Sequence, residues 1–154
     1  MEALYPYTDR LMEEKSREQF SPWDFAAHPA KIVLINLGTN DVNPVRFAAS
    51  RAEGDEEEVW FTKRYRAFLE QVRSLNGPDS WIVCTLGPLD YYLYDQIEKT
   101  VRQYQQDTGD QRVTAFKLTG VNLITEGFGA DGHPSMKTHI RMGEELAERL
   151  KALR

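Results

Sequence analysis

The sequence has a single cysteine among its 154 residues, so it cannot form a disulfide within the chain. This residue, Cys84, lies in the apolar run Trp81-Ile82-Val83-Cys84. We therefore expect it to pack as a small hydrophobic side chain rather than to take part in redox chemistry.

A basic surface is also missing, because 24 acidic residues outnumber 19 basic residues and the formal net charge is −5. That balance argues against nucleic-acid binding, which needs clustered positive charge. No run approaches the roughly 20 apolar residues of a membrane span, and Met1 is followed by Glu2 rather than by a basic, apolar leader. We expect a soluble protein with no signal peptide in this chain and with neither nucleic acid nor a membrane as partner.

Three segments are predicted to be strands, because they are rich in β-branched and aromatic residues and each ends at a glycine or a turn. They are residues 31–37, 80–86 and 112–118. The first two are continuous apolar runs, which is typical of strands covered on both faces.

Three helices are predicted between and after these strands, at residues 57–76, 91–108 and 136–153. In the first, apolar residues recur at spacings of four and three: Phe61, Tyr65, Phe68, Val72 and Leu75. The inward-facing residues expected in the second are Ile97, Val101 and Tyr104, and in the third Ile140, Gly143, Ala147 and Leu150. A further, charged helix is predicted for residues 8–20. The alternation of strands and helices predicts one α/β domain over residues 1–154, with a parallel sheet.

Two polar clusters follow predicted strands, at the edge of the sheet where α/β proteins bind ligands. The first is Gly38-Thr39-Asn40-Asp41. There an Asn amide can stabilise an oxyanion by about 3–4 kcal/mol, although Asn and Asp also serve as turn formers. The second is Gly129-Ala130-Asp131-Gly132-His133-Pro134-Ser135, where His133 is a candidate general base. We expect the other histidines, His28 and His139, to be packing or surface residues.

Metal binding is a further possibility for Asp131, His133 and His139, but their spacing matches no standard metal motif. We therefore expect neither a metal nor a cofactor.

The two clusters carry a resemblance to a known family. Ile35-Asn36-Leu37-Gly38-Thr39-Asn40-Asp41 resembles the third conserved block of SGNH (GDSL-like) hydrolases, and residues 129–135 resemble the fifth. Trp23-Asp24-Phe25 and Leu86-Gly87-Pro88 are similar to elements of the acetyl-xylan-esterase-like branch, the second family of carbohydrate esterases. The similarity extends over residues 4–150. It implies a three-layer α/β/α, flavodoxin-like fold and an esterase or deacetylase acting on acetylated carbohydrate or small acyl esters.

The resemblance also implies roles for individual residues. Asn40 would help to form the oxyanion hole, and His133 would be the general base that activates a serine. Most of the superfamily has an Asp three residues before this histidine, where this chain has Ala130. Either Asp131, two residues before His133, or a backbone carbonyl, as in the carbohydrate-esterase branch, could orient the imidazole.

The resemblance also implies positions that bind substrate. They are Gly38, Thr39 and Trp23.

The family's first two blocks are absent, among them the Gly-Asp-Ser turn that carries the nucleophile. None of the six serines stands in that context: Ser16, Ser21, Ser50, Ser74, Ser80 and Ser135. Ser135 is better interpreted as part of the entry to the last helix, and Ser21 is a weak candidate. The nucleophile could be an unexpected serine, a group from another chain or a water molecule activated by His133.

The resemblance further implies that the first two of five strands are missing and that the domain is shortened at its N-terminus. The strand from Ile32 to Ile35 would then present an unpaired edge, which invites pairing with another chain. We expect a homodimer, a partner chain or the first thirty residues to cover it. Besides an active esterase, the alternatives are a binding protein without turnover and a shortened form of an ordinary esterase.

Overall fold

The computed structural model describes residues 4–8, 20–41 and 54–153. Its elements are β1 (Ile32–Asn36), η2 (Thr39–Asp41), α2 (Gly54–Asn76), β2 (Trp81–Leu86), α3 (Tyr94–Thr108), β3 (Val113–Lys117), η3 (Ala130–Gly132) and α4 (Met136–Lys151). The strands form a parallel sheet in the order β1-β2-β3. The three strands and three helices predicted from the sequence are therefore confirmed, with ends that differ by a few residues.

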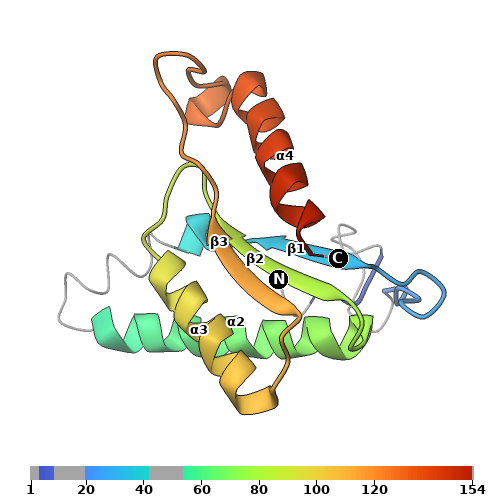
Figure 1. The fold of residues 1–154 in the computed structure, drawn as a ribbon. Coiled ribbons are helices and arrows are strands. Elements are labelled where there is room, and N and C mark those ends of the chain that lie inside the picture. Colours follow the sequence, from blue (N-terminus) through green and yellow to red (C-terminus); the bar gives the residue numbers. More distant parts are fainter. Residues whose placement is uncertain (1–3, 9–19, 42–53, 154) are drawn as a thin grey trace.

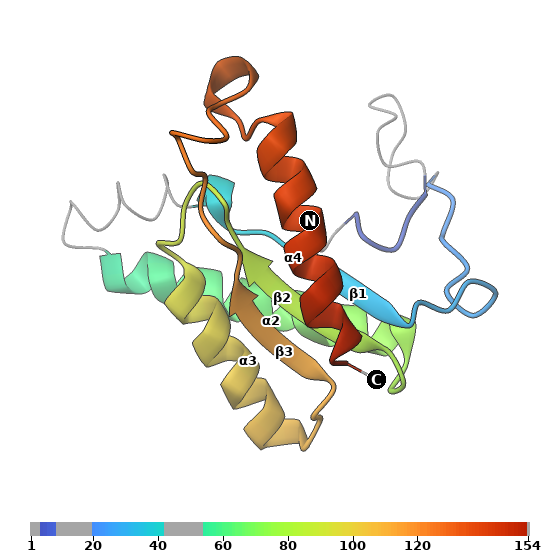
Figure 2. The ribbon, with the colours of Figure 1, turned by 45° about the horizontal axis from the view of Figure 1, so that its top comes forward.

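The elements form three layers, as predicted for an α/β/α fold. Helices α2 and α3 cover one face of the sheet, and α4 lies on the opposite face (Figure 1). The turned view shows the same arrangement and places the loop before α4 beyond the carboxyl ends of the strands (Figure 2).

The hydrophobic core lies between the sheet and the α2 and α3 layer. Leu69 and Val72 of α2 are completely buried there, with Ile82 of β2 and Ile97 of α3. The helical stripe predicted for α2 is correct at Phe61, Tyr65, Phe68 and Val72, which are all buried. Leu75 is only half-buried, since it is the second-last residue of the helix. This core packs α2 against β1 and so fixes the position of the turn that follows β1.

We expected both β1 and β2 to be covered on both faces, but only β2 is. In β2 the residues from Ile82 to Leu86 are buried, whereas in β1 only Ile35 is buried and Leu34 is 41% exposed. The expectation was wrong for β1 because no described element packs over its outer face. Among the described residues β1 pairs with β2 alone and forms one edge of the sheet.

The inward face predicted for α4 is also wrong in part. Ile140 is 57% exposed, and Gly143 and Ala147 are exposed as well. Thr138 is the one fully buried residue on this helix, while Leu150 is half-buried. Thr138, Arg141 and Glu145 face inward instead, because they form hydrogen bonds to the loop before the helix.

The charged helix predicted for residues 8–20 falls largely on residues 9–19, which lie outside the described part of the chain. Of the helices that the structure describes, none combines the length and the apolar character needed to cross a membrane.

Candidate active site

The turn after β1 is built around Gly38. Its φ of 131° lies where side chains are rarely accommodated, and a Cβ atom would come within 3.1 Å of Leu86 Cδ1. The Asp41 backbone N–H donates to the Gly38 carbonyl oxygen over 3.1 Å, which closes η2. Asn36 Nδ2 also donates to the Gly87 carbonyl oxygen over 3.0 Å and joins this turn to the one after β2. The glycine therefore places Thr39 and Asn40 at the carboxyl edge of the sheet.

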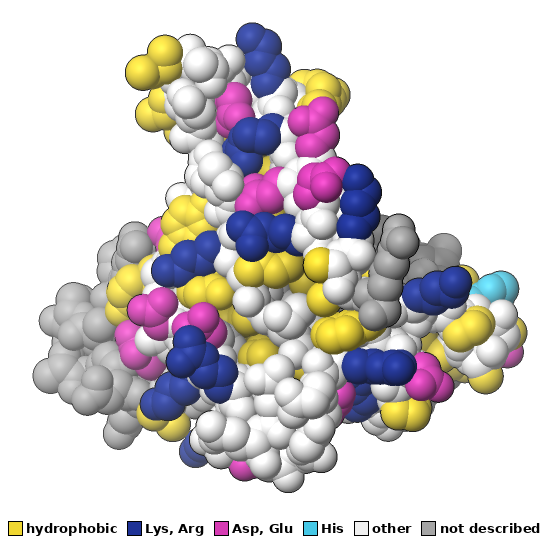
Figure 3. All heavy atoms as spheres, in the orientation of Figure 1, with side chains coloured by type: hydrophobic (Ala, Val, Ile, Leu, Met, Phe, Trp, Pro, Cys, Tyr) yellow, Lys and Arg dark blue, Asp and Glu magenta, His cyan; other side chains and the backbone are white. Residues whose placement is uncertain are grey.

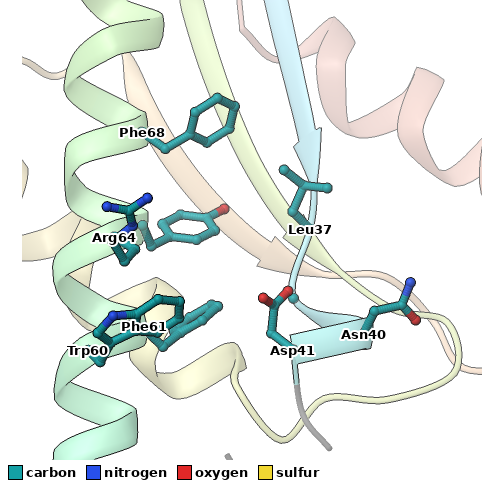
Figure 4. A pocket seen from close by; sticks show the side chains of 9 residues that line it. Leu37, Asn40, Asp41, Trp60, Phe61, Arg64 and Phe68 are labelled. Carbon is teal, nitrogen blue, oxygen red and sulfur yellow. The ribbon is translucent and has the colours of Figure 1, made fainter. Parts of the chain in front are cut away.

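Asn40 is exposed at this turn. A cavity of about 340 Å³ lies beside η2, lined on one side by Asn40 and Asp41 and on the other by aromatic residues of α2, including Trp60 and Phe61. The Asn40 carboxamide points away from these aromatic side chains (Figure 4). Its amide group is therefore directed to solvent on the other side of the turn.

The second cluster forms a tight turn whose hydrogen bonds converge on His133. The Gly129 N–H donates to the His133 carbonyl oxygen over 2.7 Å, and the His133 N–H donates to the Ala130 carbonyl oxygen over 3.0 Å. The ring atom Nδ1 lies 3.2 Å from the same Ala130 oxygen. Because a carbonyl oxygen can only accept, this contact assigns the ring proton to Nδ1. Nε2 is then unprotonated in the neutral ring and can act as a base.

Asp131 takes a left-handed backbone conformation, with φ 52° and ψ 32°, and its side chain is exposed. The partner of His133 Nδ1 is the Ala130 carbonyl oxygen, which agrees with orientation by a backbone carbonyl. A catalytic role for Asp131 stays a prediction.

Glu126 and Arg141 connect the loop that carries His133 to α4. The Glu126 carboxylate accepts hydrogen bonds from Arg141 Nε, from Thr138 Oγ1 over 3.0 Å and from the Asn122 N–H over 3.1 Å. The hydrogen bond from Arg141, followed by that from Asn122, lowers the pKa of the Glu126 carboxyl to about 2. The pair is therefore fully charged at neutral pH.

Neither Glu126 nor Arg141 was singled out from the sequence. The two residues are fifteen positions apart, and neither belongs to a recognisable motif. Only the fold places them together.

Trp23 lies apart from the other predicted site residues. It precedes β1 and stacks on His28, with ring centroids 4.8 Å apart. It lines a second cavity, of about 440 Å³, at the amino end of β1 together with Tyr5 and Ile32. Gly38, Thr39 and Asn40, by contrast, lie at the carboxyl end of the same strand (Figure 1). The substrate-binding role of Trp23 stays a prediction, and the structure does not bring this residue to the Asn40 turn.

The potential nucleophiles whose bonds the structure defines have structural partners. Ser80 Oγ donates to the Ala30 carbonyl oxygen over 2.6 Å, and Ser135 Oγ donates to the Glu126 carbonyl oxygen over 2.8 Å. Ser135 also caps α4, as the sequence indicated. Cys84 is buried as expected, and its burial raises the pKa of the thiol to about 12, so it stays protonated. Among the described residues, no group of three His, Cys, Asp or Glu side chains is placed to hold a metal ion.

The chain is similar to several esterases of known structure or function. Cellulase/esterase CelE of Acetivibrio thermocellus is 33% identical over 133 residues, which are 84% of this chain and 15% of CelE. The acetyl xylan esterase Est2A from the rumen bacterium Butyrivibrio proteoclasticus superposes with a TM-score of 0.84 at 23% identity, over 99% of this chain and 45% of Est2A. That likeness supports the fold alone.

A family two carbohydrate esterase from Clostridium thermocellum, solved in complex with cellohexaose, gives a TM-score of 0.75 at 29% identity. The match covers 96% of this chain and 41% of the esterase, so this chain spans less than half the length of the structures it resembles. A family model described as GDSL-like lipase/acylhydrolase matches residues 4–146. Because this match extends over most of the sequence, the chain belongs to the GDSL-like lipase/acylhydrolase family.

Proposed function

We propose that this domain is a carboxylic-ester hydrolase that removes acetyl groups from acetylated carbohydrate or cleaves other small acyl esters. The observation that carries the proposal is the contact between His133 Nδ1 and the Ala130 carbonyl oxygen, which leaves Nε2 available as a base. The similarity to carbohydrate esterases supports the class of substrate.

The chemistry follows from the roles of two residues. His133 Nε2 takes the proton of an attacking hydroxyl while that oxygen bonds to the ester carbonyl carbon, and the Asn40 amide donates to the oxyanion. Collapse of this tetrahedral species breaks the bond to the alcohol, which receives the proton back from His133. If the attacking group is a serine, water then releases the acid from the acyl-enzyme by the same two steps; if it is water, the acid forms directly.

A fluorophosphonate probe and intact-mass measurement test whether a serine is activated. The probe phosphonylates such a hydroxyl with loss of fluoride, so we expect one adduct per chain in the wild type. We expect no adduct in His133→Ala, because the base is lost. His139→Ala is the matched control, since His139 is exposed on α4, and it should react like the wild type. A folded wild-type sample that forms no adduct would rule out the serine route.

A binding protein without turnover is the second candidate. It is favoured by the structural bonds of Ser80 and Ser135 and by the protonated state of Cys84. It predicts that an acetylated xylo-oligosaccharide binds, as measured by calorimetry, with no release of acetate.

The exposed edge of β1 suggests that the domain works with a partner. Its apolar side chains border the 440 Å³ cavity, and Leu34 is 41% exposed. We expect a second copy of the chain to cover this edge, since unpaired strand edges associate readily. Sedimentation velocity should then show a dimer that Leu34→Lys converts to a monomer. Ile124→Lys, which changes an apolar residue that is 96% exposed on another surface, should leave the dimer intact. A wild type that is monomeric at all concentrations would contradict the dimer and leave a different chain, or the first thirty residues of this one, to cover the edge.

A further inference from the structure

The loop between β3 and α4, residues 119–135, has little apolar contact to hold it in place. Its large hydrophobic residues face solvent: Leu123 is 59% exposed, Ile124 96% and Phe128 55%. Figure 3 shows hydrophobic atoms on the surface at the tip of this loop. Because packing does not hold the loop, polar contacts must fix the position of His133.

Arg141 holds the first part of the loop against α4. Its Nη2 donates to the carbonyl oxygens of Thr119 and Gly120 over 3.1 and 3.0 Å. The Thr119 N–H donates in turn to Glu145, one turn further along the helix, over 3.0 Å. The chain leaving β3 is therefore bound to the second and third turns of α4.

Glu126 holds the middle of the loop to the same part of α4. Only 9% of its side chain is exposed, and its carboxylate binds Arg141 and Thr138. Its backbone carbonyl oxygen accepts from Ser135 Oγ over 2.8 Å, so the residue binds the helix through both side chain and backbone.

These contacts close the base of the short segment that contains His133. The Glu126 carbonyl oxygen and Ser135 Oγ join its two ends, and the bridge between Phe128 and Pro134 pairs the next residues inward. His133 lies within this closed segment, and its ring orientation depends on the turn that the segment forms.

We propose that Glu126 and Arg141 are positioning residues that hold the His133 loop against α4. They thereby keep His133 Nδ1 hydrogen-bonded to the Ala130 carbonyl oxygen. This inference rests on the proposed function only in taking His133 as the base. Neither residue belongs to the catalytic groups themselves, since Glu126 and Arg141 act through the loop and α4.

The orientation of the His133 ring can be measured without any activity, by ¹⁵N NMR of the imidazole nitrogens. We expect the neutral ring of the wild type to carry its proton on Nδ1. Glu126→Gln keeps the shape of the side chain and removes its charge. We therefore expect a smaller fraction of the neutral His133 rings to carry the proton on Nδ1. The signals of His28 and His139 should not move. Glu144→Gln is the matched control, because Glu144 is exposed on α4 and should leave His133 unchanged.

Arg141→Lys provides a second variant, which retains the charge but not the contacts to both Glu126 and the two carbonyl oxygens. It should shift the His133 tautomer in the same direction, and it serves as the test if Glu126→Gln does not fold. Where the wild type reacts with the fluorophosphonate, both variants should react about 10- to 100-fold more slowly. An unchanged His133 tautomer in a folded Glu126→Gln or Arg141→Lys protein would overturn the proposal. A wild type that neither forms an adduct nor releases acetate from an acetylated xylo-oligosaccharide would contradict the esterase function. If the two variants still show the tautomer shift, the positioning role stays intact.

Discussion

Leu69→Ala is expected to lower the free energy of unfolding by about 2–5 kcal/mol, since it removes a fully buried side chain from the core and leaves a cavity. Leu69 lies on α2 within the cluster that joins this helix to β2 and α3. A loss of this size is a large fraction of the roughly 5–15 kcal/mol that stabilises a typical domain. Urea unfolding followed by circular dichroism measures it.

Leu123→Ala is the matched control for this variant. Leu123 lies on the loop before α4 and is 59% exposed, so its loss should change the stability by no more than about 0.5 kcal/mol. Equal effects at the two positions would mean that the layer of α2 and α3 does not form the core described above.

Arg73→Met is expected to cost about 2–4 kcal/mol, because one guanidinium group joins three segments of the fold. It donates to Asp110 over 2.8 Å, and to the carbonyl oxygens of Gly77 and Ser80 over 2.6 and 2.7 Å. Its side chain is 13% exposed and that of Asp110 is 19% exposed. Methionine has a similar length but leaves the carboxylate and the carbonyl oxygens without this donor, and partial solvent access reduces the cost below that of a fully buried pair.

The control is Arg102→Met, also at a helical arginine that pairs with a carboxylate. Arg102 is 67% exposed and pairs with Glu98 one turn away, so its replacement should cost at most about 0.5 kcal/mol. Thermal and urea unfolding of both variants check the difference. A small effect of Arg73→Met would mean that solvent takes over its hydrogen bonds and that the connection from α2 to β2 is held by packing alone.

The two turns of the proposed site are held in place in different ways. The Asn40 turn follows a strand whose packing against α2 fixes it, and Gly38 makes the close approach to Leu86 possible. The His133 turn is carried by a loop that polar contacts hold on α4. We therefore expect the geometry of His133 to respond to surface substitutions more readily than that of Asn40.

Most of the fold could be predicted from the sequence because its signals are local. The apolar runs at β1 and β2, the β-branched and aromatic residues of β3 and the repeated spacing of Phe61, Tyr65, Phe68 and Val72 are properties of neighbouring residues. The turn at Gly38 and the cap at Ser135 could be anticipated for the same reason, since each depends on one residue and its immediate surroundings. The two clusters at the ends of strands likewise located the candidate site.

By itself, the sequence determined the order of strands and helices, the glycine turn that carries Asn40 and the loop that carries His133. The tertiary structure decided which face of α4 turns inward, because stripes at helical spacing compete and the contacts of Arg141 select one of them. It also decided that Glu126 and Arg141 meet and that Trp23 lies at the amino end of β1. Such contacts join residues that are distant in the chain, so their geometry and energy depend on the packed sheet and have no counterpart in any short stretch of sequence.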